Sequence, residues 1–204
     1  MSLAGNLIDA GRGFFYVGSG QAAVVHAGIG GGKSTTAAEA ARLLRARSFR
    51  VSGLLSHRVY EGTQLIGYDL EDLGAERSYP LVRLSSLKPG DGWETHGNPI
   101  YSFSVRGFDE ANGALRRAAA EAGVCPVIFV DEYGRLESRG LGLAPGALAV
   151  FASLAAGASV AVLCRTGMIT EVEGLLHPWT GDVSSFPAGD PAQVAAYLAG
   201  DGLK

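Results

Sequence analysis

Short apolar runs alternate with longer segments of helical periodicity along most of the chain. Continuous apolar runs bounded by turn residues are typical of buried parallel strands, and they occupy residues 22–27, 50–56, 126–130 and 159–163, with a short strand near 183. Helices are expected at 35–47, 108–122, 148–156, 169–176 and 191–198. This alternation predicts an α/β fold: a three-layer sandwich with a mostly parallel sheet, the 22–27 strand near its centre, and helices on both faces.

The segment 58–84 has a different pattern. It consists of short runs with β-branched and aromatic residues, broken by polar and Gly-containing turns at 61–63 and 72–75. Such runs predict antiparallel hairpin strands, with 65–70 in the middle, at one edge of the sheet. Residues 87–99 are expected to form a Gly- and Pro-rich loop, 100–105 a further strand, and 1–21 a loosely ordered lead-in.

Composition narrows the class of protein. With 204 residues, of which 47% are hydrophobic and 18% charged, the chain is expected to form a single domain over 1–204. A net charge of −3 predicts no nucleic-acid partner, because binding to the phosphate backbone usually needs a clustered positive face. Without a long apolar run or a signal peptide, the chain is expected to avoid membranes and to be cytoplasmic. Cys125 and Cys164 are isolated, which predicts buried thiols.

The stretch His26–Thr35 has the chemistry of a phosphate-binding loop, of the Walker A type, between a strand and a helix. Successive glycines let backbone N–H groups turn inward around an anion, and the helix that follows directs its positive end at the same place. Lys33 is predicted to reach the terminal phosphates, and the Ser34 hydroxyl to ligate Mg²⁺. Ala27 replaces the Gly that opens the strict pattern. The residues expected to bind the nucleotide are Gly28, Ile29, Gly30, Gly31, Gly32, Lys33, Ser34 and Thr35.

Two acids follow the apolar run 127–130. Ligands bind at the carboxyl ends of the strands in doubly wound sheets, so Asp131 is predicted to hold Mg²⁺ opposite Ser34. Glu132 is then a candidate base, or orienting group, for the water that attacks the terminal phosphate. Because Glu follows Asp here, a further strand is expected between this strand and the loop strand, as in additional-strand ATPases.

Arginines are candidates for stabilising charge in the transition state of phosphoryl transfer. Arg135 is favoured because it follows the acidic pair closely in the chain, and it joins Lys33 and Glu132 in the predicted catalytic set. Three other arginines follow strand ends or lie in loops that could face the site: Arg58, Arg139 and Arg165.

The segment Asp131–Glu137, together with the loop 27–35, resembles the small P-loop nucleoside-triphosphatase family of thermophiles, which has a cancer-related animal relative. The order of later features fits this family: 51–58 leads into a hairpin with 66–70, and Tyr101 and Phe108 open a strand and a helix. The resemblance covers about residues 22–182. It implies a Mg²⁺-dependent hydrolase of ATP, GTP and other nucleoside triphosphates. The chain departs from the family pattern at Gln64, at Pro99–Ile100 and in the insertion-like segment 140–146.

Two other functions use the same loop. A small-molecule kinase needs an acceptor pocket and a mobile lid, for which the loop 87–99 is the candidate. A nucleotide-switched binding or accessory protein would use hydrolysis to change its affinity for a partner, through the region 58–84 or the loop after Arg139. No motif marks the base that the chain prefers, its physiological substrate or its oligomeric state.

Overall fold

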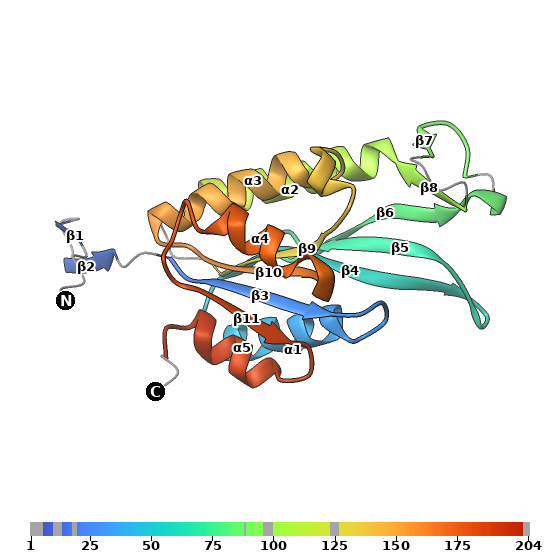
Figure 1. The fold of residues 1–204 in the computed structure, drawn as a ribbon. Helices are drawn as coiled ribbons and strands as arrows, with labels where there is room; N and C mark the ends of the chain where they lie inside the picture. The colour runs from blue at the N-terminus through green and yellow to red at the C-terminus, as the bar shows by residue number, and fades with distance from the viewer. Residues whose placement is uncertain are drawn as a thin grey trace.

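The computed structural model describes residues 6–9, 14–17, 20–87, 89–95, 100–122 and 127–201. These residues form one nine-stranded sheet that is covered by helices on both faces, together with the connecting loops and a small separate sheet (Figure 1). The strands of that sheet are β3 (Ala22–Ala27), β4 (Val51–Glu61), β5 (Gln64–Asp72), β6 (Arg77–Leu84), β7 (Trp93–Glu94), β8 (Tyr101–Ser104), β9 (Val127–Tyr133), β10 (Ser159–Arg165) and β11 (Val183–Pro187). The helices are α1 (Lys33–Ala46), α2 (Val105–Ala120), α3 (Ala144–Ser153), α4 (Ile169–Leu176) and α5 (Pro191–Leu198).

The sheet has a parallel half and an antiparallel half, in the order β11-β3-β10-β9-β4-β5-β6-β8-β7. β10 pairs in parallel with both β3 and β9 and separates them, which confirms the additional strand that the order of the two acids predicted. The predicted central position of the 22–27 strand is wrong. β3 is the second strand of the sheet, with only β11 outside it, and it is also second among the five parallel strands.

The antiparallel half extends the sheet well beyond the phosphate-binding part of the molecule. β4, expected to end near Ser56, runs on to Glu61 and forms a hairpin with β5, and β6 pairs with β5 in turn. These strands confirm an antiparallel edge region over 58–84. They do not form the outermost edge, since β8 and β7 lie beyond β6, and β7 falls inside the segment expected to be a loop.

Alternate residues of the parallel strands face opposite helical layers. Val24 and Val130 pack in the core on the side of α2, α3 and α4, whereas Val25 and Phe129 pack in the core on the side of α1 and α5. Both faces of the strands are therefore buried, which explains why their sequences are continuous apolar runs. This arrangement is the predicted three-layer sandwich (Figure 1).

Several boundaries differ from those that periodicity predicted. The second helix begins at Val105, not near Phe108, because the Ser104 side chain caps it by accepting a hydrogen bond from the Gly107 N–H at 3.0 Å. The third helix begins at Ala144, with Pro145 in its first turn, so only the first part of the insertion-like segment 140–146 is a loop. Periodicity placed that start near Leu148, because a proline and a glycine inside the first turn conceal it.

The amino-terminal region, the cysteines and the helix lengths bear on three further predictions. The segment expected to be a loosely ordered lead-in contains two short strands, β1 (Asn6–Asp9) and β2 (Phe14–Val17), which pair with each other in a separate antiparallel sheet. Cys164 is buried as expected, whereas Cys125 lies outside the described residues. No helix in the described ranges is long and apolar enough to cross a membrane.

Candidate nucleotide-binding site

The loop between β3 and α1 has the conformation that its glycines allow. Gly30 and Gly32 have φ angles of 73° and 84°, in the left-handed region that side chains disfavour. A β-carbon on Gly31 would lie 2.7 Å from that of Ala27, so a side chain would clash there. The Thr36 N–H donates to the Gly32 carbonyl at 2.8 Å and opens α1 directly from the loop. The chain thus presents an exposed turn at the amino end of a helix, as the sequence predicted.

Lys33 is held against the second predicted element of the site. Its side chain comes from the first residue of α1 and is almost fully buried, with 7% of the residue exposed. The Nζ atom lies 3.6 Å from Oε2 of Glu132, at the carboxyl end of β9. Lys33 and Glu132 are about a hundred positions apart in the sequence, and they meet at the carboxyl ends of the parallel strands, where the loop begins.

Asp131 is the most deeply buried carboxyl group at the carboxyl ends of the parallel strands. Only 1% of the residue is exposed. Its Oδ2 accepts a hydrogen bond from the Ser56 N–H at 2.8 Å, whereas its Oδ1 has no hydrogen-bond partner. Burial raises the pKa of Asp131 to about 6, against the opposing effects of the nearby Ser34 hydroxyl, the Ser56 amide and the Lys33 charge. A buried polar atom without a partner is rare in proteins and is expected where an ion binds.

The donor chemistry around this oxygen fits Mg²⁺. The ion takes oxygen ligands and usually keeps several waters, so one or two carboxylates and a hydroxyl suffice when phosphates complete its coordination. Ser34 and Asp131 supply such oxygens. In the described part of the chain no three His, Cys, Asp or Glu side chains gather as a metal site.

A break in strand pairing explains how two consecutive acids reach one site. Adjacent residues of a regular strand point to opposite faces of the sheet. Here Leu163 of β10 pairs with Asp131 and the next residue, Cys164, pairs with Tyr133, so Glu132 is left out of the register. Such bulges redirect side chains and are common beside active sites. Glu132 consequently lies next to Lys33 while Asp131 stays buried near Ser34.

The arginine contacts differ from the order of preference that the sequence suggested. Arg165, the last residue of β10, places its Nε 3.4 Å from Oε1 of Glu132. Arg58 reaches over the loop, with Nη2 3.1 Å from where a β-carbon on Gly30 would stand. Arg135 is exposed and, among the described residues, forms no ion pair with an acid of the site. The sequence did contain a signal that Arg165 lies near the site, because Arg165 follows an apolar strand, as Asp131 and Glu132 do.

The chain after the acidic strand is held by a buried carboxyl group whose role the sequence did not indicate. Glu137 accepts hydrogen bonds from the Gly134 N–H at 3.0 Å and the Leu143 N–H at 3.1 Å, one with each oxygen. Burial raises the pKa of Glu137. These bonds join the two ends of the segment 134–143, which follows β9 directly in the chain.

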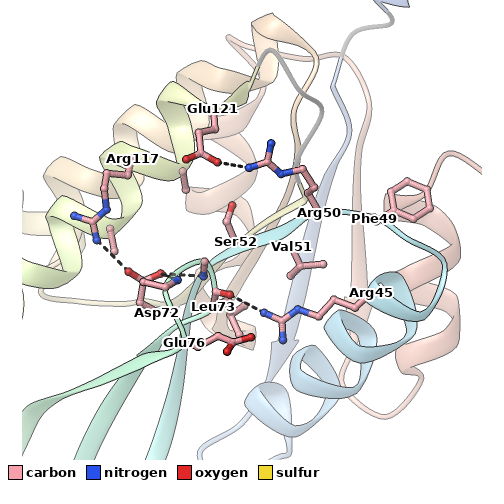
Figure 2. A pocket seen from close by; sticks show the side chains of 14 residues that line it. Arg45, Phe49, Arg50, Val51, Ser52, Asp72, Leu73, Glu76, Arg117 and Glu121 are labelled. Atoms are coloured by element: carbon pink, nitrogen blue, oxygen red, sulfur yellow. Dashed lines mark hydrogen bonds and ion pairs between the residues drawn. The ribbon is translucent and has the colours of Figure 1, made fainter.

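Two cavities lie at the two ends of α1. One, of about 390 Å³, opens beside the phosphate-binding loop. The other, of about 420 Å³, lies between the carboxyl ends of α1 and α2 and the turn after β5, where Figure 2 shows most of its charged side chains bonded to one another or to the backbone. Those contacts are Arg117 with Asp72, Arg50 with Glu121, and Arg45 with the carbonyl of Leu73.

A phosphate-binding loop with an Asp-Glu pair one intervening strand away is the arrangement of P-loop nucleotide-binding proteins. The model of the NTPase family matches residues 23–154, more than half of the chain, and the chain belongs to this family. It is 31% identical over 108 residues to the nucleoside-triphosphatase THEP1 of Thermofilum pendens (strain DSM 2475 / Hrk 5). That match covers 52% of the chain and 54% of the relative, so the chain spans about half the length of this curated relative.

Solved structures share the fold over nearly the whole chain. The solution structure of a human cancer-related nucleoside triphosphatase has a TM-score of 0.60 at 21% identity and covers 89% of this chain and 94% of its own. The crystal structure of THEP1 from the hyperthermophile Aquifex aeolicus has a TM-score of 0.62 at 16% identity and covers 89% and 97%. The family and the fold that the sequence predicted are confirmed.

Proposed function

We propose that the protein is a Mg²⁺-dependent nucleoside-triphosphatase that hydrolyses ATP, GTP and other nucleoside triphosphates to diphosphate and phosphate. One observation carries the proposal. A buried Asp131 with one oxygen lacking a partner lies at the same edge of the sheet as Ser34, and Glu132 lies 3.6 Å from Lys33. Membership of the NTPase family supports it.

Each residue of the site has a role that its position supports. The backbone N–H groups of 28–35 bind the phosphate oxygens, and Lys33 neutralises charge on the terminal phosphates. Ser34 and Asp131 would hold Mg²⁺, which would neutralise charge on the phosphates when bound. Glu132 accepts a proton from water as the water oxygen bonds to the γ-phosphorus. The bond from that phosphorus to the β–γ bridging oxygen breaks, and the diphosphate leaves.

The arginines nearest this reaction are Arg165 and Arg58. Arg165 contacts Glu132 and can orient that carboxylate toward the water, whereas Arg58 lies above the loop, where charge develops on the γ-phosphoryl oxygens. Arg135 stays a prediction from its place in the sequence.

Phosphate release from ATP and GTP, measured with and without Mg²⁺ and with no acceptor present, tests the proposal. Glu132→Gln is expected to reduce kcat by about 10²- to 10⁴-fold, the usual contribution of a general base. Glu110→Gln, which changes an exposed acid on α2, is the matched control and should keep full activity.

The alternatives give different results in the same assay. No release above background, or equal release by Glu132→Gln, contradicts hydrolysis as the function. Turnover that requires an added nucleoside or sugar identifies a kinase. Release that rises greatly with a cell extract favours a nucleotide-switched accessory protein.

A further inference from the structure

The cavity beside the phosphate-binding loop runs along the first turns of α1. Its walls are Gly31, Gly32, Thr35 and Glu39 on one side, and Gly189 with Pro191, where α5 begins, on the other. Its volume of about 390 Å³ lies in the range of small-molecule sites, about 300–1,000 Å³. The cavity adjoins the phosphate-binding loop, because Gly31 and Gly32 belong to both.

The outer wall is fixed to the loop strand and the loop helix. β11 pairs in parallel with β3, and beyond it the Ala188 N–H donates to the His26 carbonyl at 2.9 Å. The Gly189 N–H donates to Oγ1 of Thr36, a buried residue of α1, at 3.0 Å. Hydrogen bonds thus connect the outer wall of the cavity to the strand and the helix that flank the phosphate-binding loop.

Glu39 is placed one helical turn beyond Thr35 on the same side of α1. A turn advances the helix by about 5.4 Å, so Glu39 lies farther from the loop than Thr35 by about this distance. The ribose of a nucleotide lies at a similar distance from its phosphates. Its carboxylate is bonded to Arg42 through contacts of 2.6 and 2.8 Å. This pairing lowers the pKa of Glu39 and keeps the group an acceptor. A carboxylate offers about four acceptor positions, so the pairing leaves room for further donors.

We propose that this cavity seats the nucleoside of the bound triphosphate, with Glu39 accepting hydrogen bonds from the ribose hydroxyls and Pro191 packing against the base. Glu39 contributes the one charged side chain among the residues that line the cavity. Ribose hydroxyls are donors that suit an acceptor-only group. The inference rests on the proposed function, because it takes the triphosphate in the loop as given.

Direct binding measurements separate the nucleoside seat from the phosphate site. The ligands are ATP, 2′,3′-dideoxy-ATP and inorganic tripolyphosphate, each titrated with Mg²⁺ into the full chain and into Glu39→Ala. Wild type is expected to bind ATP about ten-fold or more tightly than dideoxy-ATP, since hydrogen bonds to a charged group are the stronger kind. Glu39→Ala should bring this ratio close to one and leave the affinity for tripolyphosphate unchanged or slightly higher.

Glu110→Ala is the matched control, because Glu110 is also a helical acid paired with an exposed arginine, Arg106. It should leave all three affinities unchanged. In wild type, ATP but not tripolyphosphate should slow amide hydrogen exchange at residues 189–194. A ratio that persists in Glu39→Ala, or equal protection by tripolyphosphate, overturns the inference while leaving hydrolysis intact. Failure of wild type to bind any of the three ligands overturns the proposed function as well.

Discussion

Two buried aspartates mark two regions of this molecule with opposite properties. Asp72, in the cavity of Figure 2, uses both carboxylate oxygens: one accepts from the Gly74 and Ala75 N–H groups at 3.0 and 3.1 Å, and the other binds Arg117 at 3.0 Å. Asp131 is more deeply buried yet leaves one oxygen without a partner. A fully bonded carboxylate stabilises the fold, whereas an incompletely bonded one costs stability, and in the proposed function Mg²⁺ would be its missing partner.

The difference shows how the same side chain acquires two roles from its surroundings. Asp72 lies just before a turn whose backbone N–H groups need acceptors, so its bonds are local and form with the fold. Asp131 lies near the carboxyl end of a buried strand, where the Ser56 N–H donates to one of its oxygens and leaves the other without a partner. Of the two cavities, the one beside Asp72 is the larger, but four of its charged side chains form two ion pairs, and it lies at the opposite end of α1 from the phosphate loop. Cavity size is therefore a poor guide to the functional site here.

The largest contrast is expected in activity. Asp131→Asn should lower kcat with Mg²⁺-ATP by on the order of a hundred-fold or more, because stabilisation of transition-state charge by a metal is worth several kcal/mol. Asp72→Asn should keep kcat within about two-fold, since its bonds do not reach the site. Phosphate-release kinetics on both folded variants measure this. Comparable losses in the two variants would contradict the division of roles.

A pH effect on stability is expected next in size. Because the pKa of Asp131 is raised to about 6, the native state retains a proton that the unfolded chain releases above about pH 4. The free energy of unfolding of the ligand-free protein should therefore fall as pH rises through this window, by as much as about 3 kcal/mol. Urea denaturation at several pH values measures the slope. In Asp131→Asn that contribution should vanish, and the variant should be the more stable protein above pH 6.

Removal of the Asp72 side chain should reduce stability more modestly. Asp72→Ala leaves two turn N–H groups and a guanidinium without their acceptor, at a cost of about 2 kcal/mol in the free energy of unfolding. Asp72→Asn should lose less, because an amide oxygen still accepts from the turn. Urea denaturation at pH 7 compares the two. An alanine variant as stable as wild type would show that solvent replaces these bonds.

The smallest effect isolates the ion pair. The Arg117 side chain is 57% exposed, and exposed pairs contribute about 0–1 kcal/mol. Arg117→Ala should therefore lower the free energy of unfolding by about 1 kcal/mol or less, with a smaller effect in high salt. A loss equal to that of Asp72→Ala would assign the stabilisation to the ion pair and not to the turn bonds.

Local patterns predicted the elements that carry the candidate site. The phosphate loop needs only a strand, a run of glycines and a helix in sequence, and all of these are adjacent in the chain. The acids at the end of β9 were found for the same reason, because an apolar strand that ends in two carboxylates is a local signal. The helix starts at Val105 and Ala144 were misplaced where a capping serine and a proline, not the apolar repeat, fix the boundary.

The sequence by itself thus determined that the chain is an α/β protein with a phosphate loop and an acidic strand. Only the tertiary structure decided that β3 lies next to the edge, that a bulge turns Glu132 toward Lys33, and that Arg165 reaches Glu132. It also decided that Gly189 and Pro191 form a wall beside the loop. The physical reason is that strand order and register depend on pairing between segments far apart in the chain, whereas loop and helix signals depend on neighbouring residues.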